Sequence, residues 1–228
     1  MPNHVPDLIA TLTTMQTDTD QALELGRTLR EQCTARLMLY TATYQQAGQL
    51  GGSLIGLDAV ESAIEMAERV RDDVGGPDEH LESWAGALGA LRAPLEAASV
   101  ATGTVAARSL TSKQLYADGV VAVDLALTVL ETRRSDLVPK VESARSLPGA
   151  TDLDEARRHL VDIKEWAELN VRTEDDLFKP FTDWWFTQFQ QSPVRLPPSR
   201  RRSFYQAVRF LSPQMQTVVD LSSVILTV

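Results

Sequence analysis

The most constraining feature of this chain is the spacing of its apolar residues over the first 48 positions. An interval of three or four residues keeps side chains on one face of an α-helix and is close to the repeat of coiled coils. The positions on this stripe are Leu8, Leu12, Met15, Thr19, Ala22, Gly26, Leu29, Cys33, Leu37, Tyr40, Tyr44 and Ala47. The pattern predicts one helix from Pro6 to Gly48, roughly 60 Å long at 1.5 Å per residue. Thr19 and Gly26 weaken the stripe, which allows a bend near Gly26.

Similar stripes predict helices over about 58–74, 77–98, 112–146 and from 152 to Pro180, followed by two short helices capped by Ser199 and Ser212. The glycines of 48–56 and 75–77 and the segment 101–110 read as connections. Pro94 and Pro139 should kink or break their helices, and Pro180 should end its helix, because proline removes a backbone donor and crowds the preceding turn. Asp152 and Glu155 form a predicted capping box.

The sequence shows neither a long alternation of apolar and polar residues nor an internal repeat. We therefore predict an all-α fold: an elongated antiparallel helical bundle of about five to seven helices with a long N-terminal helix. We expect residues 1–150 to form a long-helix bundle. Residues 151–228 would form a helical region rich in aromatics and arginine that packs on it, with a single domain as the alternative.

Charge is distributed unevenly along the chain. The net charge of −9 comes from the acidic first 193 residues, whereas residues 194–228 carry five basic and one acidic side chain. An acidic body disfavours nucleic acid as a partner and leaves the last segment as the place for anionic ones. Neither a signal peptide nor a run of about 18 apolar residues is visible, and Cys33 is the only cysteine. These features favour a cytoplasmic protein.

Groups that could carry catalysis or bind a metal are scattered. His4, His80 and His159 lie in three different segments, and the pair Glu155 and His159 has the spacing of a solvated helical pair rather than of a metal site. Cys33 lies on the apolar stripe, where a free cysteine usually acts as a small buried hydrophobe. We therefore expect no catalytic residue, no metal and no cofactor, and favour a protein that is not an enzyme.

Aromatic residues are concentrated near the C-terminus. Nine of the 14 lie between Phe178 and Phe210. Taking about 100° per residue, Phe178, Phe181, Trp184, Trp185 and Phe189 share one helical arc and should form a buried face, whereas Phe186 falls outside it. The triplet Arg200, Arg201 and Arg202 stands at an expected helix start, where the helix dipole disfavours cations, so something acidic should compensate.

Tryptophan and arginine are frequent anchors of protein interfaces. The leading hypothesis is therefore a non-catalytic adaptor, scaffold or assembly subunit that docks a protein partner, possibly an acidic one, through this segment. The predicted partner-binding residues are Trp184, Trp185, Phe186, Phe189, Arg200, Arg201, Arg202 and Tyr205. Homo-oligomerisation is compatible with the long stripe.

Two alternatives stay open: a sensor domain with a small-molecule pocket lined by Trp184, Trp185 and Phe189, and a peripheral membrane or pore-forming helical protein, which is less favoured. The apolar C-terminal stretch "MQTVVDLSSVILTV" is expected to pack into a groove of its own body or of a partner.

Overall fold

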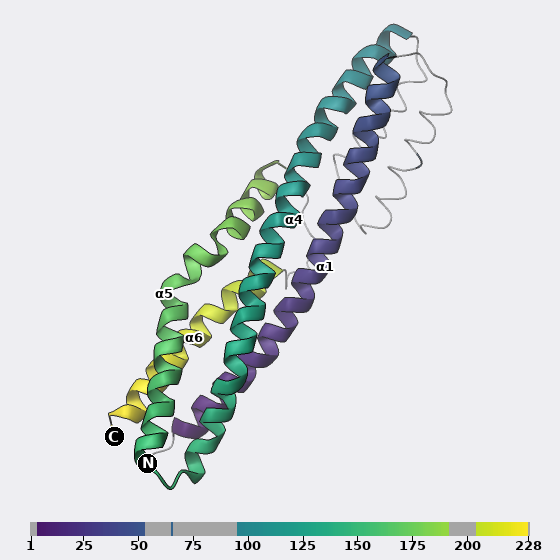
Figure 1. The fold of residues 1–228 in the computed structure, drawn as a ribbon. Coiled ribbons are helices and arrows are strands. Elements are labelled where there is room, and N and C mark those ends of the chain that lie inside the picture. Colours follow the sequence, from purple (N-terminus) through teal and green to yellow (C-terminus); the bar gives the residue numbers. More distant parts are fainter. Residues whose placement is uncertain (1–3, 53–64, 66–94, 192–203, 228) are drawn as a thin grey trace. The chain divides into compact units, whose positions relative to one another are not determined.

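Helices account for almost all of the chain that can be described. The computed structural model describes residues 4–52, 65, 95–191 and 204–227, without the side chains of 50–52, 95–101 and 188–191. Within those ranges it contains helices α1, α4, α5 and α6 and a short 3₁₀ turn, and no strand (Figure 1). This confirms the all-α prediction. Of the helices expected over 58–74 and 77–98, only residue 65 and residues 95–98 are described, so the total of five to seven stays a prediction.

Helix α1 spans His4–Gly52 and confirms the long N-terminal helix over its described length. Asp7 lies in its first turn, where a carboxylate meets the positive end of the helix dipole. The weak stripe position Thr19 is buried, and its hydroxyl donates to the carbonyl oxygen of Met15 at 2.7 Å. That bond satisfies the polar group within the helix, so a threonine can occupy a core position.

Helix α4 spans Leu95–Ser146, so the expected connection at 101–110 is wrong. The buried stripe of α4 continues through that segment on Val105 and on two residues that read as polar, Thr102 and Ser109. The hydroxyl of Ser109 donates to the carbonyl oxygen of Val105, which again removes the cost of burying it. Small polar residues at core positions therefore concealed a continuous helix.

Helix α5 spans Leu153–Gln191 and continues through Pro180, where the sequence predicted its end. Pro139 in α4 and Pro213 in α6 likewise lie within helices. All three prolines are on exposed faces, where the carbonyl that loses its helical hydrogen bond can still reach water. At the other end of α5, the backbone N–H groups of residues 154 and 155 donate to the Asp152 carboxylate, which confirms the Asp152 half of the predicted capping box.

Helix α6 spans Phe204–Leu226 as one helix, so the prediction of a helix start at Ser212 is wrong. The predicted cap at Ser199 lies outside the described residues. One face of α6 is buried, and its buried residues are Phe204, Val208, Leu211, Met215, Val218, Ser222 and Ile225. This confirms that the apolar C-terminal stretch packs against the protein's own body along one side.

The chain forms two compact units that interleave along the sequence. The first unit comprises Met1–Thr28, Asp124–Thr182 and Arg202–Val228, and the second comprises Leu29–Val123 and Asp183–Arg201. Three helices therefore contribute segments to both units. A division into independent domains at residue 150 stays a prediction, because compactness does not measure independent folding.

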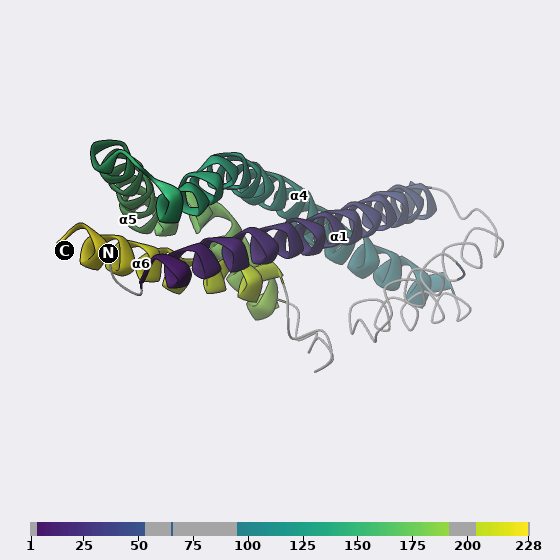
Figure 2. The same cartoon turned by 90° about the horizontal axis from the view of Figure 1, so that it is seen from below.

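The first unit is an antiparallel bundle of four helical segments (Figures 1 and 2). Polar contacts connect neighbouring helices in the order α1, α4, α5, α6 and back to α1: Asp20 with Arg134, Lys140 with Asp162, Asp175 with Arg209, and Asp18 with Gln214. At the α1–α4 edge, Arg27 also lies 3.7 Å from Glu131, so residue numbers rise along one helix as they fall along its neighbour. That order defines an up-down-up-down bundle.

The apolar core of the first unit fills one stretch of this bundle. It contains Val5, Leu8, Leu12, Met15, Leu137, Val141, Ala144, Leu147, Ala156, Leu160, Ile163, Ala167, Met215, Val218 and Ile225. This core ends at Met15 on α1, Leu137 on α4 and Ala167 on α5. The next buried residue past that end is polar on each helix: Thr19, Arg133 and Asn170. The core is thus interrupted by a polar layer, which we define as Thr19, Arg133, Asn170 and Glu174.

Several aromatic contacts lie in the described part of the second unit. The rings of Tyr40 and Tyr116 stack with centroids 5.4 Å apart, and Arg36 donates to the Tyr116 hydroxyl at 2.8 Å while lying over its ring. Lys113 lies over the ring of Tyr44. These contacts join α1 to α4 within this unit and combine apolar burial with cation–π attraction.

Candidate functional site

The predicted aromatic face is mostly buried. Phe178, Phe181, Trp184 and Trp185 are each at most 6% exposed, which confirms the spacing argument for these four residues. In the first unit, the ring of Phe181 meets Phe204 edge-on with centroids 4.8 Å apart. The second unit contains Trp184 and Trp185, whose rings are 6.2 Å apart. Most of the aromatic cluster therefore packs the interior.

Trp184 is held by α4 within the second unit. Its indole N–H donates to the backbone carbonyl of Leu115 at 2.9 Å. The ring lies directly against Gly119, where an added Cβ would be 2.5 Å from Cζ2 of the indole. Only glycine allows so close an approach, because any side chain would overlap the ring. The indole is therefore a packing element whose polar group is already satisfied.

Phe186 is the exception that the sequence predicted. Its side chain is 54% exposed, although it is next to two buried tryptophans on the same helix. Tyr205, in α6 of the first unit, is half-buried. Phe189 lies in α5 without a described side chain, and Arg200, Arg201 and Arg202 lie outside the described residues. Of the predicted docking residues with described side chains, Phe186 alone offers a largely exposed ring.

A second candidate site is the polar layer inside the first unit. The side chains of Arg133 and Glu174 are 5% and 6% exposed, and Nη1 of Arg133 lies 3.9 Å from Oε2 of Glu174. Nη2 of Arg133 donates to the backbone carbonyl of Asn170 at 3.4 Å, and its guanidinium carbon lies 5.0 Å from the centre of the Phe178 ring. Nε and Nη1 of Arg133 have no hydrogen-bond partner within the described structure. This is a buried ion pair with incomplete hydrogen bonding.

Burial shifts the pKa of both members of the pair. It raises the pKa of the Glu174 carboxyl, and the charge of Arg133 and the Ser212 hydroxyl oppose this rise. Two nearby charged groups have opposite effects on the pKa of Glu174: Asp175 raises it and Arg209 lowers it. Burial likewise lowers the pKa of Arg133, against the attraction of Glu174. Desolvation thus outweighs the mutual attraction on each side.

The sequence interpretation missed this pair, although its spacing was visible. Arg133 lies three residues after Leu130 and four before Leu137, which are stripe positions of α4. Glu174 lies four residues after Asn170 and four before Phe178 on the buried face of α5. Charged residues at core spacing are a signal that could have identified each of the two positions as buried.

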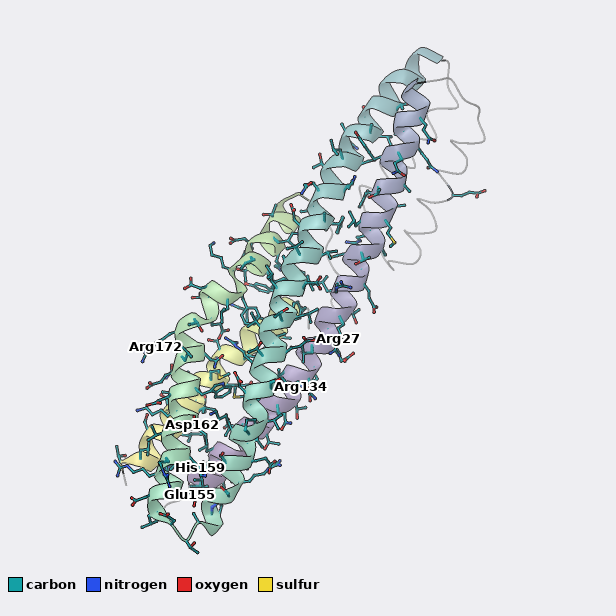
Figure 3. The ribbon with its side chains drawn as sticks, in the orientation of Figure 1. Arg27, Arg134, Glu155, His159, Asp162 and Arg172 are labelled. Atoms are coloured by element: carbon teal, nitrogen blue, oxygen red, sulfur yellow. The ribbon has the colours of Figure 1, made fainter. Side chains whose placement is uncertain are left out.

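A hollow of about 390 Å³ lies between α1 and α4 in the first unit. It is lined by Asp20, Leu23, Glu24, Arg27, Glu131, Arg134 and Ser135. Arg134 pairs with Asp20, and Arg27 contacts both Glu24 and Glu131; Figure 3 labels the two arginines. The lining has three carboxylates and two guanidinium groups, so ion pairing leaves one net negative charge in the hollow.

Two further residues with potentially reactive side chains, Cys33 and His159, have surroundings typical of structural residues. Cys33 is buried, and this burial raises the pKa of its thiol to about 12, against the weaker opposing effect of Arg36. His159 lies 3.8 Å from Glu155 one turn earlier on α5, and both side chains are substantially exposed (Figure 3). That geometry is the solvated helical pair expected from the sequence.

Comparisons with protein families, with curated proteins and with solved structures found no match. Among the described helices, none combines the length and the apolar character needed to cross a membrane.

Proposed function

We propose that this protein acts through protein–protein contacts, as an adaptor, scaffold or assembly subunit, and that its C-terminal aromatic and arginine segment docks the partner. The observation that carries the proposal is the exposure of Phe186. A phenylalanine that remains 54% exposed beside two buried tryptophans leaves apolar surface in water. Contact with a partner would remove that surface from water, which would stabilise the complex by about 25 cal/mol for each Å² of apolar surface buried.

The partner is expected to combine an apolar pocket with acidic groups. An apolar pocket suits the ring of Phe186. Acidic groups on the partner would complement residues 194–228, which carry five basic side chains, including the triplet 200–202, and only one acidic side chain. Trp184 and Trp185 then support the site by packing behind it, and do not act as the anchors themselves.

A comparison of captured proteins tests the proposal. Tagged full-length chain is expressed in its native cells as wild type, Phe186→Ser, the triple change of 200–202 to glutamate, and Leu153→Ser as a matched control. Leu153 is 65% exposed on the same helix, so its substitution removes a comparable exposed apolar side chain elsewhere. We expect one or more proteins to be captured by wild type and by Leu153→Ser but not by the other two variants.

Capture must then be reproduced with purified proteins, because co-purification alone does not establish contact. If the two docking variants and the control capture the same proteins in the same yield as wild type, the docking assignment is wrong. The packing of Trp184 against Gly119 gives the pocket hypothesis less support than the docking hypothesis, because that indole is already in contact with the helix beside it.

A further inference from the structure

Helix α6 has a composition unlike that of its neighbours. Its 23 residues include only two charged side chains, Arg209 and Asp220. Helix α5, by contrast, carries charged residues on every turn of its exposed side from Asp154 to Arg172. A surface helix typically carries charged and polar residues on the side opposite its apolar stripe, and α6 has few charges there.

The structure covers α6 on one side only. Its outward side consists of Gln206, Phe210, Pro213, Thr217, Asp220 and Val224, and every one of these residues is exposed. Taking about 100° per residue, the six side chains lie within an arc of about 80°. Phe210 is 68% exposed and Val224 is 44% exposed, so this arc, the outer face of α6, presents apolar surface to water.

The spacing of the outer face is symmetric. Its residues follow one another at intervals of four, three, four, three and four. When two identical helices pack antiparallel about a two-fold axis, such a pattern aligns with itself: Gln206 opposes Val224, Phe210 opposes Asp220, and Pro213 opposes Thr217 of the second copy. Each Phe210 ring then inserts between side chains one turn apart on the other helix, as knobs enter holes in coiled coils.

The two charges of α6 fit the same alignment. Arg209 is adjacent to Phe210, so it lies next to Asp220 of the second copy, and the symmetry repeats this pair of opposite charges. In the single chain both groups are exposed: Arg209 lies 3.5 Å from Asp175, which is itself almost fully exposed, and Asp220 accepts from the side chain of Gln216. Both can therefore reach across such an interface.

We propose that a second copy of this chain covers the outer face of α6, with the two α6 helices antiparallel. This surface differs from the docking segment around Phe186, and the inference does not depend on the proposed function. One helix pair buries less than the standard interface of about 1,600 Å², so the association is expected to be weak and to depend on protein concentration.

Sedimentation velocity of the full-length chain over a range of concentrations tests this inference. We expect a monomer–dimer equilibrium in the wild type. Phe210→Asp should shift the chain to monomer, whereas Leu153→Asp, a comparably exposed site on α5, should leave the equilibrium unchanged. Because Phe210 is mostly exposed, its substitution should not prevent folding, and helical circular dichroism checks this directly.

Charge reversal gives a second, independent test. Arg209→Asp and Asp220→Arg should each weaken the dimer, because each places like charges opposite one another. A mixture of the two variants should recover dimer formation, because every cross-helix pair is then of opposite sign. The inference is overturned if the wild type stays monomeric up to its solubility limit. It is also overturned if a dimer forms that is insensitive to Phe210→Asp, or if the mixture associates no better than either variant alone.

Discussion

The buried pair of Arg133 and Glu174 allows a quantitative prediction from three variants: Arg133→Met, Glu174→Leu and the double change. Both side chains are more than nine-tenths buried. Removing one member of such a pair usually costs about 3–5 kcal/mol because a buried charge is left without its partner. Replacing both members with apolar residues of similar volume is often neutral or stabilises by about 1–4 kcal/mol. The double variant should therefore be at least as stable as the wild type.

The two single variants should differ in their dependence on pH. Without Arg133, the Glu174 carboxyl can escape an unpaired charge by taking up a proton. From an ordinary pKa of about 4.3, protonation costs about 4 kcal/mol at pH 7 and about 1 kcal/mol at pH 5. Without Glu174, the Arg133 guanidinium has no such escape, and its contact with the ring of Phe178 at 5.0 Å is present in the wild type too, so that contact does not offset the loss. Arg133→Met should therefore recover most of its lost stability at pH 5, whereas Glu174→Leu should not.

Urea denaturation followed by circular dichroism at pH 5 and pH 7 measures these free energies of unfolding. A double-mutant cycle then gives the coupling between the two residues. If the double variant loses as much stability as the two single variants combined, the side chains do not meet in the core. Equal pH dependence of the two single variants would refute the protonation argument separately.

Three further predictions concern single groups. Because the pKa of Glu174 is raised on folding, the wild type should lose stability as the pH rises from about 4.3 through the folded pKa. Glu174→Gln should show a smaller fall in the denaturation midpoint over this pH range, and an equal fall in both proteins would contradict the assignment. Cys33, with its thiol pKa raised to about 12, should react with an aromatic disulfide reagent at pH 8 only after denaturant is added, and rapid reaction of the native protein would show that it is accessible. Gly119→Ala should lower the thermal midpoint by several degrees because its Cβ would meet the Trp184 ring at 2.5 Å, whereas Gly48→Ala, where a Cβ meets nothing within 4 Å, should not lower it.

Apolar periodicity predicted the helical class and the long α1 because burial of one face is the main force that aligns helices. It failed between residues 101 and 110 because Thr102 and Ser109 occupy core positions as hydroxyl residues that are satisfied within the helix. The predicted helix end at Pro180 and the predicted helix start at Ser212 were also wrong, because a proline on an exposed face can lie within a continuous helix.

The candidate site shows the same limits. Angular spacing correctly separated the exposed Phe186 from the buried Trp184 and Trp185, since one helix can bury only one arc. Spacing along one helix could not show that Arg133 of α4 and Glu174 of α5 would meet, because that contact depends on how two helices pack. The symmetry of the outer face of α6 could have been read from the sequence, but its exposure could not.

The affinity of a captured partner for the purified chain tests the docking assignment most directly. Calorimetric titration would compare wild type, Phe186→Ser and Leu153→Ser, each checked for native helix content. An interface anchor typically contributes more than about 1.4 kcal/mol, so Phe186→Ser should weaken binding at least tenfold while Leu153→Ser leaves it nearly unchanged. Equal affinity for all three proteins would show that the exposed ring of Phe186 is not where the partner binds.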